Sequence, residues 1–148
     1  IIISLEKMNN IRQFNKAAQT ITVESGMVLS QIHEIVENEN LFFPLSLGAK
    51  GSCMIGGNLS TNAGGVNVLK YGNTRELCLG LEVVLPDGKI MNLLSELKKD
   101  NTGYDLKNIL RSINTIHRSI IYHEPPPLFL EFIRFLMLYL CYLMLCPS

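Results

Sequence analysis

The residues with the clearest chemical potential lie in a glycine-rich segment. Seven of the eleven glycines of this 148-residue chain fall between Gly48 and Gly72, with small hydroxyl and amide residues between them. Glycine lets the backbone approach a ligand closely and permits positive φ angles. Backbone N–H groups presented in this way form concavities that bind anions. The segment is therefore typical of a site for a large, flat, phosphate-bearing ligand, although a glycine-rich loop without a ligand has the same composition.

Cysteine and histidine offer no second site by their spacing. No two cysteines form a C-x-x-C pair, so we expect free thiols of a reducing compartment, and Cys53 in the glycine-rich segment as a small apolar filler. We expect His33 to be a surface or half-buried residue rather than a ligand, because no second histidine follows it at i+4. The residues of these two types are Cys53, Cys78, Cys141, Cys146, His33, His117 and His123. We expect no metal site and identify no catalytic set.

Length and charge limit the remaining possibilities. A chain of 148 residues suffices for one domain with a core. Its 13 basic and 13 acidic residues give a formal net charge of zero. No basic stripe with interleaved aromatic residues is present, so nothing indicates a nucleic-acid partner.

The elements that must position the glycine-rich segment form an α+β pattern, with strands and helices mixed rather than regularly alternating. An amphipathic helix is expected over residues 27–40, with Ser25 as its N-cap, because apolar residues recur at three- and four-residue steps. A hairpin is expected around Pro86-Asp87-Gly88. The other expected elements are strands at Ile1–Leu5, Thr20–Glu24, Leu77–Leu85 and Lys89–Leu93, a turn or short helix at Met8–Phe14, and a short helix at Tyr104–Leu110.

Several runs, in order and spacing, resemble the FAD-binding PCMH-type domain of the vanillyl-alcohol oxidase family. Within that family the chain is most similar to the branch of D-2-hydroxyglutarate dehydrogenases and FAD-linked D-lactate dehydrogenases. The runs that carry the resemblance are Gly48–Ser52, Ile55–Asn58, Thr61–Gly65, Tyr71–Gly72, Leu79–Leu85, Asp87–Gly88 and Leu97–Leu106. The resemblance covers residues 1–110 and implies part of an FAD-binding domain with a mixed sheet and flanking helices.

The resemblance implies FAD as the cofactor, held largely by the glycine-rich segment. Ile55 could equally pack in the core, and Thr61 and Asn62 could equally form a turn. The implied cofactor-binding residues are Pro44, Gly48, Ala49, Gly51, Ser52, Ile55, Gly56, Gly57, Thr61, Asn62, Gly64, Gly65, Tyr71 and Gly72.

By the same resemblance, the whole enzyme would be a mitochondrial FAD-dependent D-2-hydroxyacid dehydrogenase that passes a hydride from the substrate to the flavin. The catalytic and metal-binding groups of this family lie in a substrate domain, and its pyrophosphate loop lies upstream of the resemblance. We therefore expect a fragment that is inactive alone and binds FAD weakly or not at all. The alternatives are a non-enzymatic membrane-tethered remnant and a member of another FAD oxidase branch of the superfamily.

The character of the chain changes after Leu110, where the family pattern ends. Residues 111–127 read as a linker outside the family pattern, with a stiff Pro125-Pro126-Pro127 break. Residues 128–148 form an apolar tail, interrupted by Glu131 and Arg134, which we expect to be helical. Its 19-residue apolar run approaches the length that spans a bilayer. A non-native tail is the favoured interpretation, and a membrane anchor or a packed helix are the alternatives.

Overall fold

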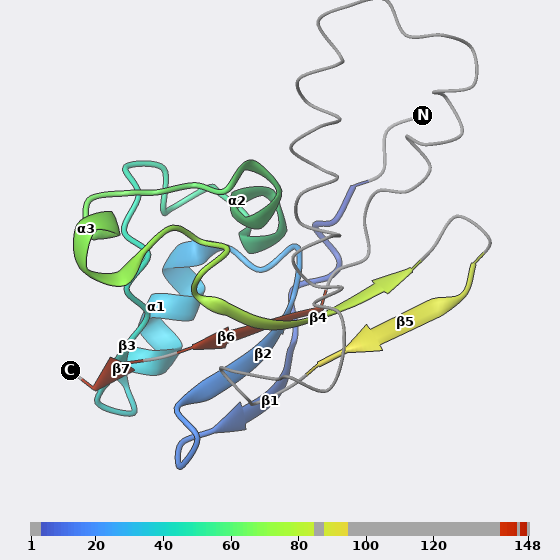
Figure 1. The fold of residues 1–148 in the computed structure, drawn as a ribbon, viewed down its shortest axis with the longest axis horizontal. Coiled ribbons are helices and arrows are strands. Elements are labelled where there is room, and N and C mark those ends of the chain that lie inside the picture. The colour runs from blue at the N-terminus through green and yellow to red at the C-terminus, as the bar shows by residue number, and fades with distance from the viewer. Residues whose placement is uncertain (1–3, 85–87, 95–139, 145, 148) are drawn as a thin grey trace, which may run out of the picture.

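The structure is a computed structural model, and it describes residues 4–84, 88–94, 140–144 and 146–147. Two helices cover one face of an antiparallel sheet in this part of the chain (Figure 1). The elements, in chain order, are β1 (Ile11–Asn15), β2 (Thr20–Glu24), α1 (Leu29–Glu37), β3 (Leu41–Phe42), α2 (Ile55–Thr61), α3 (Val68–Tyr71), β4 (Cys78–Val84), β5 (Ile90–Leu93), β6 (Leu140–Met144) and β7 (Cys146–Pro147).

The sheet brings together strands from both ends of the chain. Its order is β1-β2-β6-β4-β5, and a separate two-stranded sheet joins β3 to β7. Every pairing among these strands is antiparallel, whereas the sequence predicted a mixed sheet. In the register of the central pairs, Thr22 faces Tyr142, and Gly80 faces the same residue from the other side. The last described part of the chain therefore holds the two halves of the sheet together.

The hydrophobic core lies between this sheet and helices α1 and α2. Ile21 and Val23 alternate along β2 and point into this core, and the polar residues of the opposite face, Thr20, Thr22 and Glu24, are also buried. Leu29, Ile32 and Val36 lie one helical turn apart and form the buried side of α1. The other large, fully buried side chains are Leu45, Ile55, Leu77, Leu81, Val83 and Leu143.

Three expectations about elements are confirmed. The strand at Thr20–Glu24 has the bounds that alternation predicted. β4 and β5 form the expected hairpin, with Val84 opposite Ile90. The amphipathic helix is present but shorter than predicted, because it begins at Leu29 and ends at Glu37.

Others are wrong. Met8–Phe14 is not a turn or short helix, because residues from Ile11 onward pair with β2 as a strand. This pairing outweighs the turn preference of Asn9-Asn10. In the expected strand at Ile1–Leu5, the two described residues, Ser4 and Leu5, are not in a strand.

Ser25 is not the helix cap. It is fully buried, and its hydroxyl makes no hydrogen bond within the described residues. The N-cap is Val28, whose N–H donates to Gln31 Oε1 over 3.2 Å. The first N–H groups of α1 are taken by carbonyls of the glycine-rich segment, so a side-chain cap is unnecessary there.

The apolar tail is not helical where it is described, since residues 140–144 and 146–147 are strands. A short apolar run is compatible with a buried helix or a buried strand by its pattern alone. Here the run forms a strand because it pairs with β2 on one side and β4 on the other. The remaining expectations for residues 85–87, 95–139, 145 and 148 lie outside the described part of the chain. No helix in the described residues has the length and apolar character needed to cross a membrane.

Candidate functional site: a glycine-rich segment packed on α1

The glycine-rich segment, residues 44–72, crosses the molecule from β3 to the start of β4 and includes α2 and α3 (Figure 1). It is joined to α1 by backbone hydrogen bonds. The carbonyl of Lys50 accepts from Ser30 N–H over 2.9 Å, and that of Cys53 accepts from Leu29 N–H over 3.0 Å. The start of α1 therefore fixes the position of the glycine loop.

Residues 48–52, which we call the glycine loop, are exposed. A Cβ atom built on Gly48 or Gly51 would meet nothing within 4 Å. No described residue accepts a hydrogen bond from the backbone N–H of Gly48, Ala49 or Gly51. The Ser52 hydroxyl reaches only the Ala49 carbonyl, over 3.4 Å. The loop thus presents amide donors with no acceptor among the described residues, together with open space, and both features favour close contact with an anionic ligand.

Adjacent glycines of α2 differ sharply. Gly57 is exposed, and a Cβ on it would meet nothing within 4 Å. Gly56 is buried, and a Cβ there would lie 2.7 Å from the Cβ of Ser25 and 2.9 Å from its carbonyl oxygen. Ile55 is fully buried in the core. Of the three predicted contacts at the start of α2, only Gly57 faces open space.

Thr61 and Asn62 end α2 and are used by the chain itself. The Thr61 hydroxyl donates to the Gly57 carbonyl over 3.0 Å. Asn62 takes a left-handed conformation with φ of 51°, and its Oδ1 accepts from Arg75 N–H over 3.2 Å. These are the turn-forming roles that the sequence left open beside ligand contact.

Gly65 is required by close backbone contact. Its φ is +80°, and a Cβ would lie 2.2 Å from the Ser46 carbonyl oxygen, so no other residue fits without movement. Gly64 lies against Asn73 and Val68, with a Cβ position 3.0 Å from Asn73 Oδ1. These two glycines serve the fold directly.

Tyr71 and Gly72 end α3, on the side of the segment next to β3. The Tyr71 ring meets Phe42 edge-on, with centroids 5.6 Å apart. The Lys70 ammonium lies 4.8 Å from the centre of the Tyr71 ring, and hydrogen bonding to Tyr71 raises the pKa of Lys70. Gly72 is the C-cap. Pro44 is buried at the other end of the segment.

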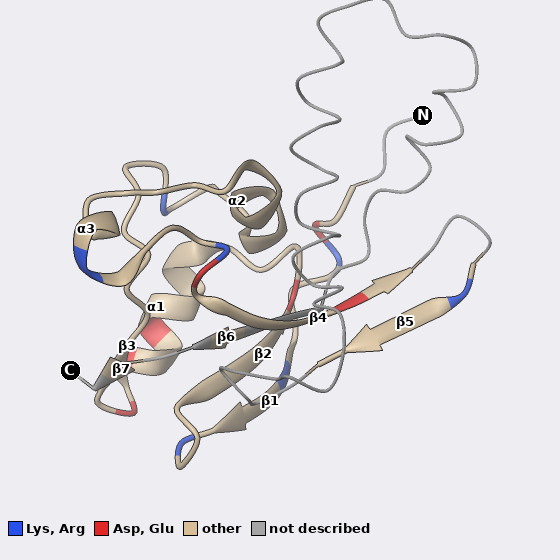
Figure 2. Ribbon diagram, in the orientation of Figure 1, with Lys and Arg blue, Asp and Glu red and all other residues tan. Residues whose placement is uncertain are grey.

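The charge of this segment suits an anion. Between Glu39 and Glu76 the chain contains no acidic residue, and Lys50 and Lys70 lie within the segment itself. Figure 2 shows the contrast, because acidic residues occur on β2, α1 and β4. This gap in the acidic residues can be read from the sequence itself and is a further signal of an anion site.

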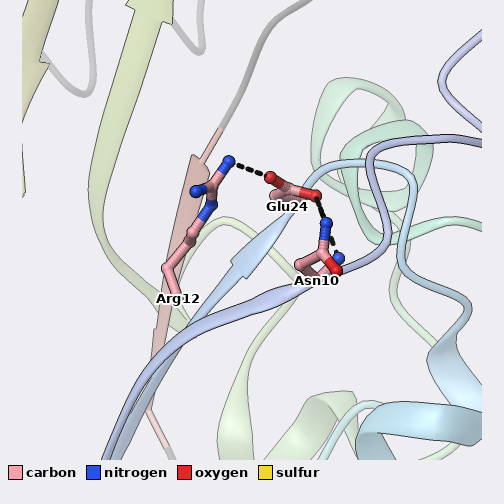
Figure 3. A network of polar contacts seen from close by, with 3 residues as sticks. All are labelled: Asn10, Arg12 and Glu24. Atoms are coloured by element: carbon pink, nitrogen blue, oxygen red, sulfur yellow. Dashed lines mark hydrogen bonds and ion pairs between the residues drawn. The ribbon is translucent and has the colours of Figure 1, made fainter.

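A polar network that sequence analysis also missed lies at the end of β2. The buried carboxylate of Glu24 pairs with Arg12 and accepts hydrogen bonds from Asn10 N–H and Asn10 Nδ2, both over 2.9 Å (Figure 3). The hydrogen bond from the Asn10 backbone, with help from its side chain and Arg12, lowers the pKa of Glu24. Only the fold shows the partners of Glu24, because Arg12 of β1 and Asn10, directly before β1, lie more than ten residues away in the sequence.

The cysteines and histidine behave as expected where they are described. Cys53, Cys78 and Cys146 form no disulfide within the described residues. Cys53 packs against the core, and its sulfur accepts from Asn58 Nδ2 over 3.4 Å. His33 is half-buried and bonds the Leu45 carbonyl. In the described part of the chain, no three metal-ligating side chains gather.

Comparison with known proteins identifies the family of this domain. The model of the FAD binding domain family matches residues 1–94, so the chain belongs to that family. FAD is therefore the family's cofactor, as the motif resemblance predicted, and the free amides, open glycine loop and lack of carboxylates suit it.

Individual relatives narrow the comparison. The chain is 50% identical over 109 residues to the mitochondrial D-2-hydroxyglutarate dehydrogenase of Bos taurus, covering 74% of this chain and 20% of that protein. It is 37% identical over 132 residues to the D-2-hydroxyglutarate dehydrogenase of Xanthomonas citri pv. viticola, covering 86% and 28%. It is 44% identical over 109 residues to the D-2-hydroxyglutarate–pyruvate transhydrogenase of Saccharomyces cerevisiae, covering 74% and 22%. The chain thus spans about one fifth to just over a quarter of these relatives.

The fold also matches a solved structure. Alkyldihydroxyacetonephosphate synthase superposes with a TM-score of 0.70 at 13% identity, covering 96% of this chain and 22% of that one. At this identity the likeness concerns the fold alone, and it agrees with the expected PCMH-type FAD-binding architecture.

Proposed function

We propose that this chain supplies part of the FAD site of a D-2-hydroxyacid dehydrogenase, of the D-2-hydroxyglutarate to 2-oxoglutarate type. The observation that carries the proposal is the exposed glycine loop, with free amides and open space at Gly48 and Gly51, in a chain about half identical to D-2-hydroxyglutarate dehydrogenases. The relatives named mitochondrial support a mitochondrial location for the whole enzyme.

Within that site we assign the direct contacts to the open positions. The amides of Gly48, Ala49 and Gly51 would donate to phosphate or ribityl oxygens, and Gly57 would let the cofactor lie against α2. When bound, FAD supplies the acceptor for the hydride that leaves carbon 2 of the hydroxyacid. Among the described residues no three metal-ligating side chains gather, and we assign cofactor binding to this chain and the substrate chemistry to other parts of the whole enzyme.

The remaining predicted contacts act through the fold in this proposal. Gly65 allows the segment to pack on itself at Ser46, and Gly56 allows it to pack against Ser25. Gly64 and Gly72 lie against Asn73 and Glu76, which follow the segment, and Thr61 and Asn62 close α2. Pro44 and Tyr71 form the buried and aromatic ends of the segment. The chain spans about one fifth of the length of such relatives, and we expect the chain alone to bind FAD weakly.

Titration with FAD, followed by flavin fluorescence, tests this proposal. We expect weak, saturable binding by the chain, and about tenfold weaker binding by Gly51→Ala and by Gly57→Ala, equivalent to about 1.4 kcal/mol each. Gln13→Ala, on the exposed face of β1, is the control and leaves affinity unchanged. An FAD affinity that is unchanged in both glycine variants would place the cofactor elsewhere.

A second measurement tests the division of labour. With D-2-hydroxyglutarate and an artificial electron acceptor, the chain should show no turnover at any FAD concentration. Turnover by this chain alone would overturn the assignment of substrate chemistry to other parts of the whole enzyme.

A further inference from the structure

The segment that leads into the glycine loop, residues 44–47, is held by a hydrogen bond to every carbonyl. The four donors come from three separate places: helix α1, the turn before α3, and the loop itself. In chain order, Pro44 O accepts from Asn67 Nδ2 over 3.1 Å, Leu45 O from His33 Nε2 over 2.9 Å, Ser46 O from Val66 N over 3.1 Å, and Leu47 O from Lys50 N over 3.1 Å.

Two of these donors are side chains, and they donate hydrogen bonds to adjacent carbonyls. His33 belongs to α1, and Asn67 is the N-cap of α3. A carbonyl oxygen only accepts, so the proton of the His33–Leu45 bond lies on Nε2 of His33. The His33 ring also lies 6.4 Å from the Phe43 ring, tilted by 48°. Its neighbour Ile32 is fully buried, which anchors this part of α1 on the core.

The hydrogen-bonded carbonyls of residues 44–47 lie directly before the glycine loop. Lys50 N–H bonds Leu47 O, while Ser52 and Cys53 N–H both bond Ala49 O over 2.9 Å. The loop is therefore a turn built on Leu47, and its orientation follows from the segment that precedes it. A shift at Leu45 would move the amides of Gly48 and Gly51 together.

We infer that His33 and Asn67 are positioning residues, which hold residues 44–47 so that the glycine loop presents its amides to FAD. The inference rests on the proposed FAD-binding function. Neither side chain needs to touch the cofactor, since each acts through a backbone carbonyl. Sequence analysis gave His33 no role, because the i+4 spacing that it examined concerns metals and not backbone contacts.

Amide hydrogen exchange without FAD directly tests whether the hydrogen bonds of His33 and Asn67 hold the loop in place. We expect His33→Leu, which removes the donor, to speed exchange several-fold at the bonded amides of Lys50, Ser52 and Cys53. Asn67→Leu should do the same, with a further effect at Val66. His33→Gln restores a donor at the reach of Nε2 and should return exchange to the wild-type rate. Glu37→Gln, on the exposed side of α1, is the control.

FAD titration of the same variants tests the consequence. Loss of one neutral hydrogen bond, about 1 kcal/mol, corresponds to about fivefold weaker binding by His33→Leu, with recovery in His33→Gln. A purely structural role for His33 would instead lower the unfolding midpoint and leave FAD affinity unchanged in the folded protein.

The outcomes separate this inference from the proposed function. If the wild-type chain binds no FAD at millimolar concentration, the proposed function fails, and with it the purpose assigned to these hydrogen bonds, even where exchange in His33→Leu is faster. If FAD binds but exchange at Lys50, Ser52 and Cys53 is unchanged in both leucine variants, the inference alone is overturned. Faster exchange with unchanged FAD affinity also overturns it.

Discussion

At the scale of single residues, the glycines of one motif divide between ligand and fold. Gly56 and Gly57 are neighbours in sequence and in α2, yet one is buried against Ser25 and the other faces open space. A sequence motif marks both equally, because it records residue type and not the surroundings of each missing side chain. The division can be measured, since the two alanine substitutions should change stability in opposite directions.

Gly56→Ala should destabilise the protein by about 1–3 kcal/mol, because its methyl group would overlap Ser25 and force the backbone apart. Gly57→Ala should stabilise it by about 0.5–1 kcal/mol, since alanine lowers the entropy lost when a helix forms. Urea unfolding followed by circular dichroism measures both. Equal effects of the two substitutions would contradict the different surroundings of these glycines.

Glu24 makes stability depend on pH. Its pKa lies below the ordinary value of 4.5, chiefly because of the Asn10 backbone hydrogen bond, so the folded state favours the ionised form. The stabilisation is complete above pH 4.5 and is lost as the pH falls through the lower folded value. Glu24→Gln should cost about 1–3 kcal/mol at pH 7.

The difference between wild type and Glu24→Gln should shrink as the pH is lowered below 4.5 and through the lower folded pKa of Glu24, where the carboxyl becomes neutral like the amide. Unfolding free energies at pH 7, 5 and 3 check this expectation. A constant difference across this range would mean that Glu24 is not held as a carboxylate by Asn10 and Arg12.

At the scale of elements, local patterns predicted the segments that are regular within themselves. Alternation located β2, and three- and four-residue steps located α1, because each pattern reflects one apolar face. β1 was missed because its polar residues gain order only by pairing with β2. The glycine loop was identified from its composition, but the hydrogen bond from His33 to Leu45 depends on contacts between residues twelve apart and could not be predicted.

β6 is the clearest failure of local pattern. Its residues were expected in a helical tail, yet Leu140–Met144 pairs with β2 on one side and β4 on the other. An apolar run carries no information about its partners, so pairing with distant strands was invisible in the sequence. Leu143 of β6 is fully buried in the core, so shortening its side chain tests whether β6 belongs to the core.

Leu143→Ala should destabilise the protein by about 2–5 kcal/mol, because it leaves a cavity between the sheet and the helices. Ile90→Ala on β5 is the matched control, since Ile90 is 67% exposed and its loss should change stability by no more than about 0.5 kcal/mol. Thermal or urea unfolding compares the two. A Leu143→Ala variant as stable as Ile90→Ala would remove β6 from the core.

At the scale of the whole molecule, the sheet and the glycine-rich segment are one connected unit. Gly56 N–H bonds Ser25 O, Ile55 N–H bonds Met27 O, and β2 ends directly before Ser25. β2 in turn pairs along its whole length with β6. Order at the proposed FAD loop therefore depends on a strand that lies almost ninety residues further along the chain.

Deletion of residues 140–148 tests this dependence and two of the three interpretations of the tail, the non-native tail and the membrane anchor. A membrane anchor or a non-native tail could be removed without loss of the domain, whereas removal of β6 leaves the edges of β2 and β4 unpaired. We expect the shortened chain to lose cooperative unfolding in circular dichroism and, with it, the weak FAD binding of the full chain. Gly57→Ala in the full chain is the comparison, because it should weaken FAD binding while cooperative unfolding remains. A shortened chain that unfolds cooperatively would show that the domain is complete without β6 and that the tail is dispensable to it.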